Sequence, residues 1–388
     1  MKLRYGDPDE AGMSAQRVRH VAQLAQSWVE QGITPSLVVL AARRGVIVLH
    51  EAFGRLTPDD DSPPLARDAL FPLASISKPI TATAVMILVE DGLLGLNRPV
   101  REYLPEFVGE GKDAVMVHHL LTHTSGLRDE DLDVHVMSKG AVPEYSIGEP
   151  PVPRLAEYLS ARYDAPLWKA PGVEMSYATF NYELLGEIVT RVSPQPLRDF
   201  VRTRICEPLG MVDTHFVVPD TLRGRVVRRP SDAVAAEFLN SRLLQDEPYA
   251  SGGAFSTALD TVIFGQMVLN RGCYGDARVL SPAAVAAMTR NQIPGIASKY
   301  DNQVFPEASW GLGWNVLGTK KAERTGSLRS AQSFDHDGNG GVLLWVDPVY
   351  EIVGVYFSVV LRDLPPFGIP DWCADLFMNA VTAAVVDV

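Results

Sequence analysis

The sequence of 388 residues contains few cysteines, no excess of positive charge and no long run of apolar residues. Its three cysteines, Cys206, Cys273 and Cys373, are odd in number and widely spaced, which excludes a disulfide-stapled scaffold and predicts reduced thiols. The formal net charge of −12 produces a field that repels phosphate, so we expect neither nucleic acid nor an anionic membrane as a partner. No apolar run reaches the roughly 18 residues that are needed to span a bilayer.

Signals for export and for nucleotide binding are also missing. The first ten residues, MKLRYGDPDE, become acidic at once and contain no apolar core of a secretory signal, so we expect a cytoplasmic protein. No G-x-G-x-x-G or P-loop pattern follows a strand, which argues against the common nucleotide sites. No G-x-S-x-G occurs either, which excludes the nucleophile elbow of α/β-hydrolases.

Strand patterns lie at both ends of the chain, and helical periodicity fills its middle. An amphipathic helix over 13–31, capped by Ser14, precedes two apolar strands at 36–44 and 46–53 that flank Gly45. The C-terminal elements are two further strands and a closing helix, over 341–347, 351–360 and 370–386. The middle of the chain contains long loops, of which the longest is expected at 128–154.

This arrangement predicts an α/β plus α architecture in which the two termini build one antiparallel sheet with flanking helices. Residues 1–70 and 301–388 are expected to form the sheet subdomain, and residues 71–300 an inserted, mostly helical subdomain of a single composite catalytic domain. A cleft between the two parts is the expected place for a site.

The segment Ser75-Ile-Ser-Lys78 opens a strongly apolar stretch that has the composition of a buried helix. Pro79 fits the first turn of that helix, where its missing N–H costs nothing, so the helix is expected to begin at or near Ser75. Residues three apart share a helix face, so Lys78 can reach the Ser75 hydroxyl. Ser77, adjacent to Lys78, is expected to point elsewhere.

A serine hydroxyl is a poor nucleophile at neutral pH and needs a neighbouring base. A lysine can serve as that base when burial and nearby cations lower its pKa, and the apolar surroundings of Lys78 make burial plausible. The S-x-x-K pattern alone is a weak signal, because a capping serine followed by a surface lysine gives the same letters. Here the pattern occurs once, at a helix start, and five further motifs accompany it.

These motifs resemble the serine β-lactamase and penicillin-binding-protein superfamily, in its class C-like branch. That branch also holds family VIII carboxylesterases, D-aminopeptidases and some acyltransferases. The matching segments are, in chain order, FPLASISKPITA (71–82), HHLLTHTSGL (118–127), PGVEMSYATFNYELLG (171–186), EPLGMVDTHF (207–216), SGGAFSTALDTVIFGQM (251–267) and SFDHDGNGGVLLWVDP (333–348). The resemblance covers nearly the whole chain and implies a β-lactamase/transpeptidase-like fold.

The resemblance implies a role for each matching residue. Ser75 takes the place of the nucleophile that forms the acyl-enzyme, and Lys78 that of its partner. Tyr177 matches the tyrosine that shares the base role and passes a proton to the leaving group. A free phenol has a pKa near 10, so this tyrosine must lie close to a cation to act at neutral pH.

The strand motif of the family, K-T-G in β-lactamases and H-x-G in many relatives, corresponds here to His336 and Gly338. The oxyanion hole is then expected from two backbone N–H groups, one of Ser75 and one of Asn339. The glycine-rich run 338–341 suits a backbone that must approach a substrate closely.

The sequence departs from the family pattern at two positions that bear on the substrate. Thr179 stands where the Y-x-N asparagine would hold an amide, and His336 replaces the lysine that attracts a carboxylate. Both changes weaken the β-lactamase and peptidase interpretations and leave acyl transfer from a plain ester intact. We therefore expect a serine carboxylesterase for small, short-chain esters, without metal or organic cofactor.

Several alternatives stay open on the sequence alone. The same acyl-enzyme could serve a β-lactamase, a D-amino-acid amidase or peptidase, or an acyltransferase, and a degenerate relative could bind ligand without catalysis. His119 and His123 share a helix face as metal ligands would, but no third ligand is near, so a packed structural segment is expected. Trp310 and Trp314 could line an acyl pocket or pack in the core. The acidic run 59–61 is expected to be solvated.

Overall fold

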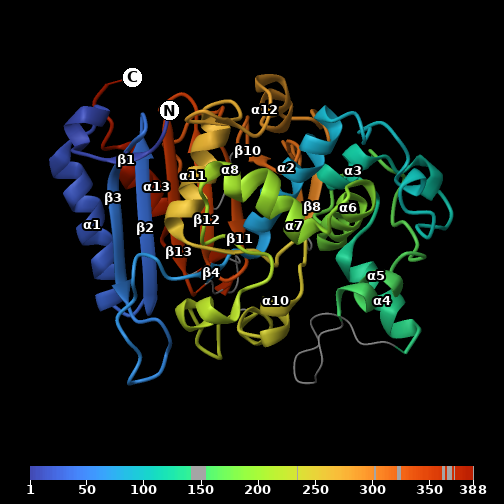
Figure 1. Ribbon diagram of the computed structural model, residues 1–388, viewed down its shortest axis with the longest axis horizontal. Coiled ribbons are helices and arrows are strands. Elements are labelled where there is room, and N and C mark those ends of the chain that lie inside the picture. Colours follow the sequence, from blue (N-terminus) through green and yellow to red (C-terminus); the bar gives the residue numbers. More distant parts are fainter. Residues whose placement is uncertain are drawn as a thin grey trace.

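The fold is organised around one seven-stranded sheet built from both ends of the chain, as the sequence predicts (Figure 1). The computed structural model describes residues 1–387, with the exception of 141–153, 234, 301–302, 321–324, 361–362, 365–368 and 371. The strands lie in the spatial order β1 (Arg4–Tyr5), β3 (Val46–Gly54), β2 (Ser36–Arg43), β13 (Ile352–Ser358), β12 (Val342–Asp347), β11 (Phe334–Gly338) and β10 (Asn315–Val316).

The N-terminal and C-terminal parts of the sheet join where β2 pairs with β13, and Leu37 lies opposite Ser358 at one end of that ladder. Neighbouring strands run antiparallel except for β1 and β3, which run parallel. The sheet is therefore mixed, whereas the sequence predicts an antiparallel one; the short β1 precedes the first helix and joins the β3 edge from outside the hairpin. The turn between β2 and β3 places Arg44 and Gly45 in the left-handed region, as a tight hairpin requires.

Helices cover both faces of the sheet, so alternate residues of each strand enter different cores. On one face lie α1 (Ala15–Glu30), capped by Ser14, and α13 (Ala374–Thr382). The N-terminal helix is confirmed. The closing helix is shorter than the predicted 370–386, because Val385 leaves the helix to bridge with Met13.

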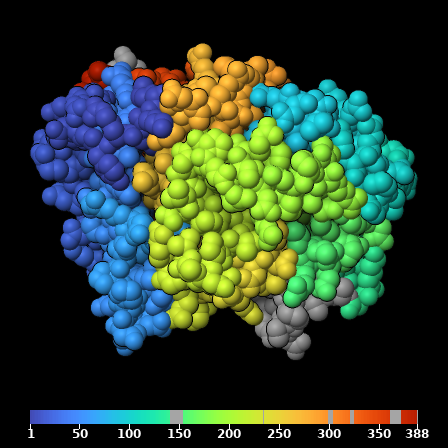
Figure 2. All heavy atoms as spheres, viewed as in Figure 1, coloured from blue at the N-terminus to red at the C-terminus, as the bar shows by residue number. Residues whose placement is uncertain are grey.

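The opposite face carries α11 (Ala258–Leu269), which lies so close that a Cβ at Gly265 would stand 2.6 Å from Val353 Cγ1. Behind it lie α2 (Ser77–Glu90) and α6 (Thr179–Val192), which pack against each other. The apolar α2 is buried along most of its length, as a helix that is hydrophobic on all sides must be. The segment of about residues 200–250 forms the middle of the face shown in Figure 2.

Most of the remaining elements are short. The helices are α3 (Val117–Leu121), α4 (Asp129–Ser138), α5 (Leu155–Ser160), α7 (Leu197–Val201), α8 (Glu207–Leu209), α9 (Ala236–Leu239), α10 (Arg242–Asp246) and α12 (Pro282–Met288). The small strands are β4 (Phe71–Pro72), β5 (Phe255–Ser256), β6 (Cys273–Tyr274), β7 (Ala277–Arg278), β8 (Ser298–Tyr300), β9 (Gln303–Phe305), β14 (Asp363–Leu364) and β15 (Ile369–Pro370).

The helix α4 contradicts the expectation of a continuous loop over 128–154. It forms because Leu132 and Val136, four residues apart, are buried on one face, and because acidic residues occupy its first turn. The rest of that expected loop, 141–153, lies outside the described residues. No helix in the described part of the chain is long and apolar enough to cross a bilayer. None of the three cysteines forms a disulfide with another described residue.

A buried arginine ties the sheet to both chain ends. Arg43 in β2 is fully buried and donates to the carbonyl oxygens of Ala11, Gly12 and Tyr350 and to Asp387. Its neighbour Arg44 is more exposed and forms ion pairs with Glu351 and Asp387.

We expect Arg43→Met to lower the free energy of unfolding by about 3 kcal/mol, because it leaves several buried carbonyl groups without a donor. The matched variant Arg44→Met removes exposed ion pairs and should cost about 0.5 kcal/mol or less. Urea unfolding followed by circular dichroism measures both. An Arg43→Met loss no larger than that of Arg44→Met would contradict this account.

Candidate active site

Ser75 lies on a tight turn directly before α2. The turn is the 3₁₀ segment η2 (Ala74–Ile76), and Ala74 has a φ of 45°, a left-handed conformation that costs energy for any residue with a side chain. The hydrogen bond from the Leu73 N–H to the Ala254 carbonyl holds this turn against β5. The strained turn leaves the Ser75 side chain at the edge of a pocket.

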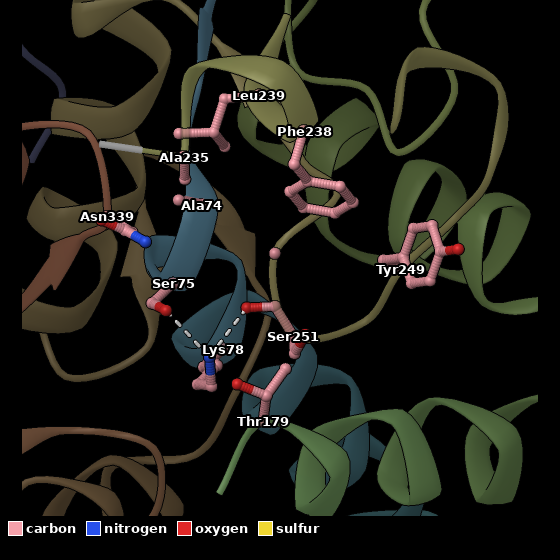
Figure 3. Close-up of a pocket in the computed structure, with 11 residues that line it drawn as sticks. Ala74, Ser75, Lys78, Thr179, Ala235, Phe238, Leu239, Tyr249, Ser251 and Asn339 are labelled. Carbon is pink, nitrogen blue, oxygen red and sulfur yellow. Dashed lines mark hydrogen bonds between the residues drawn. The ribbon is translucent and has the colours of Figure 1, made fainter. Parts of the chain in front are cut away.

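Lys78 lies one turn further along and reaches back to Ser75. Its Nζ is 2.9 Å from Ser75 Oγ and 3.0 Å from the carbonyl oxygen of Ser251, as the dashed lines in Figure 3 show. The lysine side chain is only 1% exposed. Ser77 points away from this pair, since its Oγ accepts the Ala254 N–H. The two residues of the S-x-x-K pattern are thus brought together at hydrogen-bond distance.

Tyr177 lies beside this pair at the entrance to α6. Its hydroxyl is hydrogen-bonded to Ser75, and Lys78 Nζ stands 4.9 Å from the centre of its ring. Burial outweighs the hydrogen bond and raises the pKa of Tyr177 well above its usual value of 10. Tyr177 thus lies close to a lysine, as its expected role requires, and its phenol is neutral in the resting site.

His123 supports the tyrosine from behind. The two rings stack with their centres 4.3 Å apart, and His123 Nδ1 accepts the Ala178 N–H at 3.1 Å. His119, the other member of the histidine pair, uses Nδ1 to accept the Met116 N–H. Each imidazole thus accepts a hydrogen bond from a backbone N–H, which agrees with the expectation that these histidines belong to a packed structural segment. Within the described ranges, no group of three or more His, Cys, Asp or Glu side chains is placed to hold a metal ion.

Thr179, at the position of the family's asparagine, is hydrogen-bonded to the carboxylate of Asp129. Asp129 accepts the Thr179 N–H at 2.7 Å and also a hydrogen bond from the Thr179 hydroxyl. The threonine side chain lines the pocket, but this bond already uses its one O–H donor. Asp129 begins α4, in the segment that the sequence predicts as loop, so sequence reasoning missed it.

His336 projects from β11 into the same site and is 1% exposed. Its Nδ1 lies 2.7 Å from the Asp337 carbonyl oxygen, which can only accept, so Nδ1 carries the proton. Burial is the main cause that lowers the pKa of His336 to about 3. The ring is therefore neutral at physiological pH and offers no positive charge to a substrate.

Gly338 lets β11 approach the nucleophile turn. A Cβ at this position would stand 2.4 Å from the Leu73 carbonyl oxygen and 3.2 Å from Ala74 Cβ. Asn339 follows it and lies beside Ser75 in Figure 3. Among the turn and loop hydrogen bonds of the described residues, neither the Ser75 N–H nor the Asn339 N–H donates to a backbone carbonyl.

A small pocket lies in front of Ser75. Its lining combines the reactive residues with an apolar wall and consists of Ala74, Ser75, Lys78, Thr179, Ala235, Phe238, Leu239, Tyr249, Ser251, Gly252 and Asn339 (Figure 3). Trp310 does not line it; this residue packs edge-on against His123, Tyr177 and His336. Trp314 lies in the core against Phe264 and Phe334.

Sequence reasoning also missed Glu183, which positions Lys78 indirectly. This buried residue of α6 accepts the N–H groups of Ala250 and Ser251, and so holds the carbonyl group to which Lys78 donates. Burial raises its pKa. The signal available in the sequence was an acidic residue inside the apolar stretch NYELLG, where burial is costly without partners.

Comparison with known proteins places this geometry in a family. The model of the Beta-lactamase family matches residues 21–367. A protein of Salmonella agona (strain SL483) named "Putative D-alanyl-D-alanine carboxypeptidase" is 27% identical over 98% of this chain and 91% of its own length.

Two solved structures share the fold. One is described as "EstCE1, a hydrolase with promiscuous acyltransferase activity" and is 22% identical, with a TM-score of 0.75 over 96% of this chain and 98% of its own. The other, a family VIII carboxylesterase, is 21% identical, with a TM-score of 0.74 over 96% of this chain and 99% of its own. With a family model that spans most of its length, the chain belongs to the Beta-lactamase family of serine hydrolases, and its β-lactamase/transpeptidase-like fold is that of this superfamily.

Proposed function

We propose that the protein is a serine carboxylesterase that acts on small, short-chain esters through an acyl-enzyme. The observation that carries the proposal is the contact of a buried lysine amine with the Ser75 hydroxyl, beside a pocket whose far wall is apolar. The narrow pocket and its apolar wall, which includes Ala235, Phe238 and Leu239, suit a small acyl group.

In the acylation step, neutral Lys78 accepts the Ser75 proton while the oxygen attacks the ester carbonyl. The N–H groups of Ser75 and Asn339 stabilise the oxyanion that forms. Tyr177, a neutral phenol, donates its proton to the departing alkoxide and is reprotonated by the Lys78 ammonium. Both residues thereby return to their starting states.

Deacylation repeats the same transfers with water. The Tyr177–Lys78 pair takes a proton from the attacking water, and the acyl carbonyl is held by the same two N–H groups. The proton then passes to Ser75 as the acid leaves. No step requires a metal ion or an organic cofactor.

The preference for an ester rests on two residues. A β-lactam or peptide substrate presents an amide and a carboxylate, which call for a two-ended polar partner and a cation. Thr179 is bonded to Asp129, and His336 is neutral because of burial. A plain ester requires neither partner.

A second candidate is a D-alanyl peptidase, because the Salmonella relative bears that name and aligns over nearly the whole chain. An acyltransferase is a third, since EstCE1 is described with that promiscuous activity. Both would use the same acyl-enzyme and differ in the acyl donor or acceptor.

We expect Ser75→Ala to abolish ester hydrolysis and labelling by a fluorophosphonate, because both need the Ser75 oxygen. Ser77→Ala is the matched control: it removes a buried neighbour that is bonded to the Ala254 N–H, and it should keep labelling while losing about 1 kcal/mol of stability. Mass spectrometry of each variant after treatment measures the labelling. Labelling that persists in Ser75→Ala would refute the site.

We expect Lys78→Met and Tyr177→Phe each to lower kcat for a p-nitrophenyl ester by about a thousandfold, since each removes one member of the proton relay. Steady-state kinetics on the folded variants is the measurement. A kcat within tenfold of the wild type for either variant would remove that residue from the mechanism.

A substrate panel separates the esterase from a peptidase or a β-lactamase. With p-nitrophenyl butyrate, a chromogenic cephalosporin and a D-alanyl p-nitroanilide, we expect kcat/KM for the ester to exceed the others by at least about a hundredfold. This is the cost of leaving an amide, and in the cephalosporin also a carboxylate, without partners. Turnover of the cephalosporin or the D-alanyl amide at a rate that matches the ester would favour the alternatives.

A further inference from the structure

Arg229 is a buried arginine that meets no carboxylate among the residues that the structure describes. It is 1% exposed, and the guanidinium makes a single, long hydrogen bond to these residues, of 3.5 Å from Nη2 to the Gly340 carbonyl oxygen. The Nε and Nη1 atoms have no partner within the described chain. The other buried arginines of that chain each meet an aspartate: Arg43 with Asp387, Arg162 with Asp133 and Arg329 with Asp335.

The backbone of Arg229 is fixed in this position. Its N–H donates to Asn240 Oδ1 at 2.9 Å, and Asn240 Nδ2 donates to its carbonyl oxygen at 3.0 Å. The preceding residue, Arg228, points outward and pairs with Asp59 of the acidic run. Burial lowers the pKa of Arg229 to about 9, which leaves the guanidinium charged at neutral pH.

The guanidinium lies directly behind the glycine loop that carries Asn339. A Cβ at Gly340 would stand 2.5 Å from Arg229 Nε and 2.6 Å from Nη2, so only a glycine allows this contact. Gly340 and Gly341 have φ values of 94° and 99°, which also favour glycine. Ala235 and Leu239, six and ten residues after Arg229 in the chain, line the pocket.

A buried charge without a counter-ion destabilises the folded state. Buried charged groups of this kind cluster at functional sites. Negative charge develops in this mechanism on the substrate oxygen at the Asn339 N–H. A fixed positive charge in a site of low polarity acts strongly on that oxygen, because water does not screen it.

We propose that Arg229 is a positioning residue of the oxyanion hole, which acts through the Gly340 backbone to stabilise the negative oxygen formed at Ser75 and Asn339. This inference rests on the proposed acyl-enzyme chemistry but not on the choice of an ester as substrate. It assigns to the arginine an interaction that exists in the transition state and is absent from the neutral ground state.

The test measures catalysis, binding of an anionic adduct and stability in the same variants. Arg229→Met removes the charge at similar length, Arg229→Gln removes it but keeps a donor, and Arg229→Lys keeps it. A boronic acid serves as the probe, because it adds to the serine as a tetrahedral anion. Arg228→Met, one residue away, and Arg43→Met, buried on the other face of the sheet, are the controls.

We expect Arg229→Met and Arg229→Gln to lower kcat for a p-nitrophenyl ester by about 10- to 100-fold with KM within about twofold, and to weaken the boronic acid by a similar factor. Arg229→Lys should recover part of both losses. The melting temperature of Arg229→Met should stay the same or rise, whereas Arg43→Met should melt earlier with unchanged kcat. Arg228→Met should change neither kcat nor boronate affinity.

Three results would overturn the proposal. The first is a kcat and boronate affinity within twofold of the wild type in both neutral variants. The second is a rise in KM without a change in boronate affinity, which would indicate a structural role. The third is a loss confined to monoethyl succinate and absent with ethyl butyrate, which would assign Arg229 to a substrate carboxylate.

The probe also separates this inference from the proposed function. If the wild type forms the boronate adduct but hydrolyses no ester, the carboxylesterase proposal fails, and the boronate affinities of the variants still decide the role of Arg229. If the wild type forms no adduct at Ser75, both claims fail.

Discussion

The site depends on one contact, the hydrogen bond between the buried Lys78 amine and the Ser75 hydroxyl. An ammonium group loses most of its hydration when it is 1% exposed, so burial works against the charged form and favours a base. The surrounding structure maintains this contact from two sides. The apolar α2 keeps the amine dry, and Glu183 holds the loop whose Ser251 carbonyl orients it.

The charges around that contact differ from those that the family pattern predicts. Neutral His336 and the occupied hydroxyl of Thr179 leave the substrate pocket without a cation or amide partner on that side. The positive charge of Arg229 instead lies behind the glycine loop, where it acts on the reacting oxygen. Charge in this site is therefore arranged toward the transition state, in keeping with the uncharged ester that we propose as substrate.

Local patterns in the sequence predicted much of the fold, and distant contacts account for the rest. The three-residue spacing of Ser75 and Lys78, the Ser14 cap and the hairpin at Gly45 depend on neighbours in the chain, so they could be inferred. The helix α4 was missed because two buried residues in an acidic segment give a weak periodic signal.

Other features of the site could not be inferred because they arise from packing between distant segments. The protonation of Tyr177 follows from burial against His123, and the roles of Asp129 and Glu183 follow from contacts across about 50 and 70 residues of chain. The division of the chain at residues 70 and 300 stays a prediction.

The state of the Lys78 amine tests the central claim most directly. Neutron diffraction from a deuterium-exchanged crystal at neutral pH locates the deuterons on Lys78 Nζ and Ser75 Oγ. The account predicts two deuterons on Nζ and a Ser75 O–D bond that points at the nitrogen. Three deuterons on Nζ, with the Ser75 deuteron directed elsewhere, would contradict it.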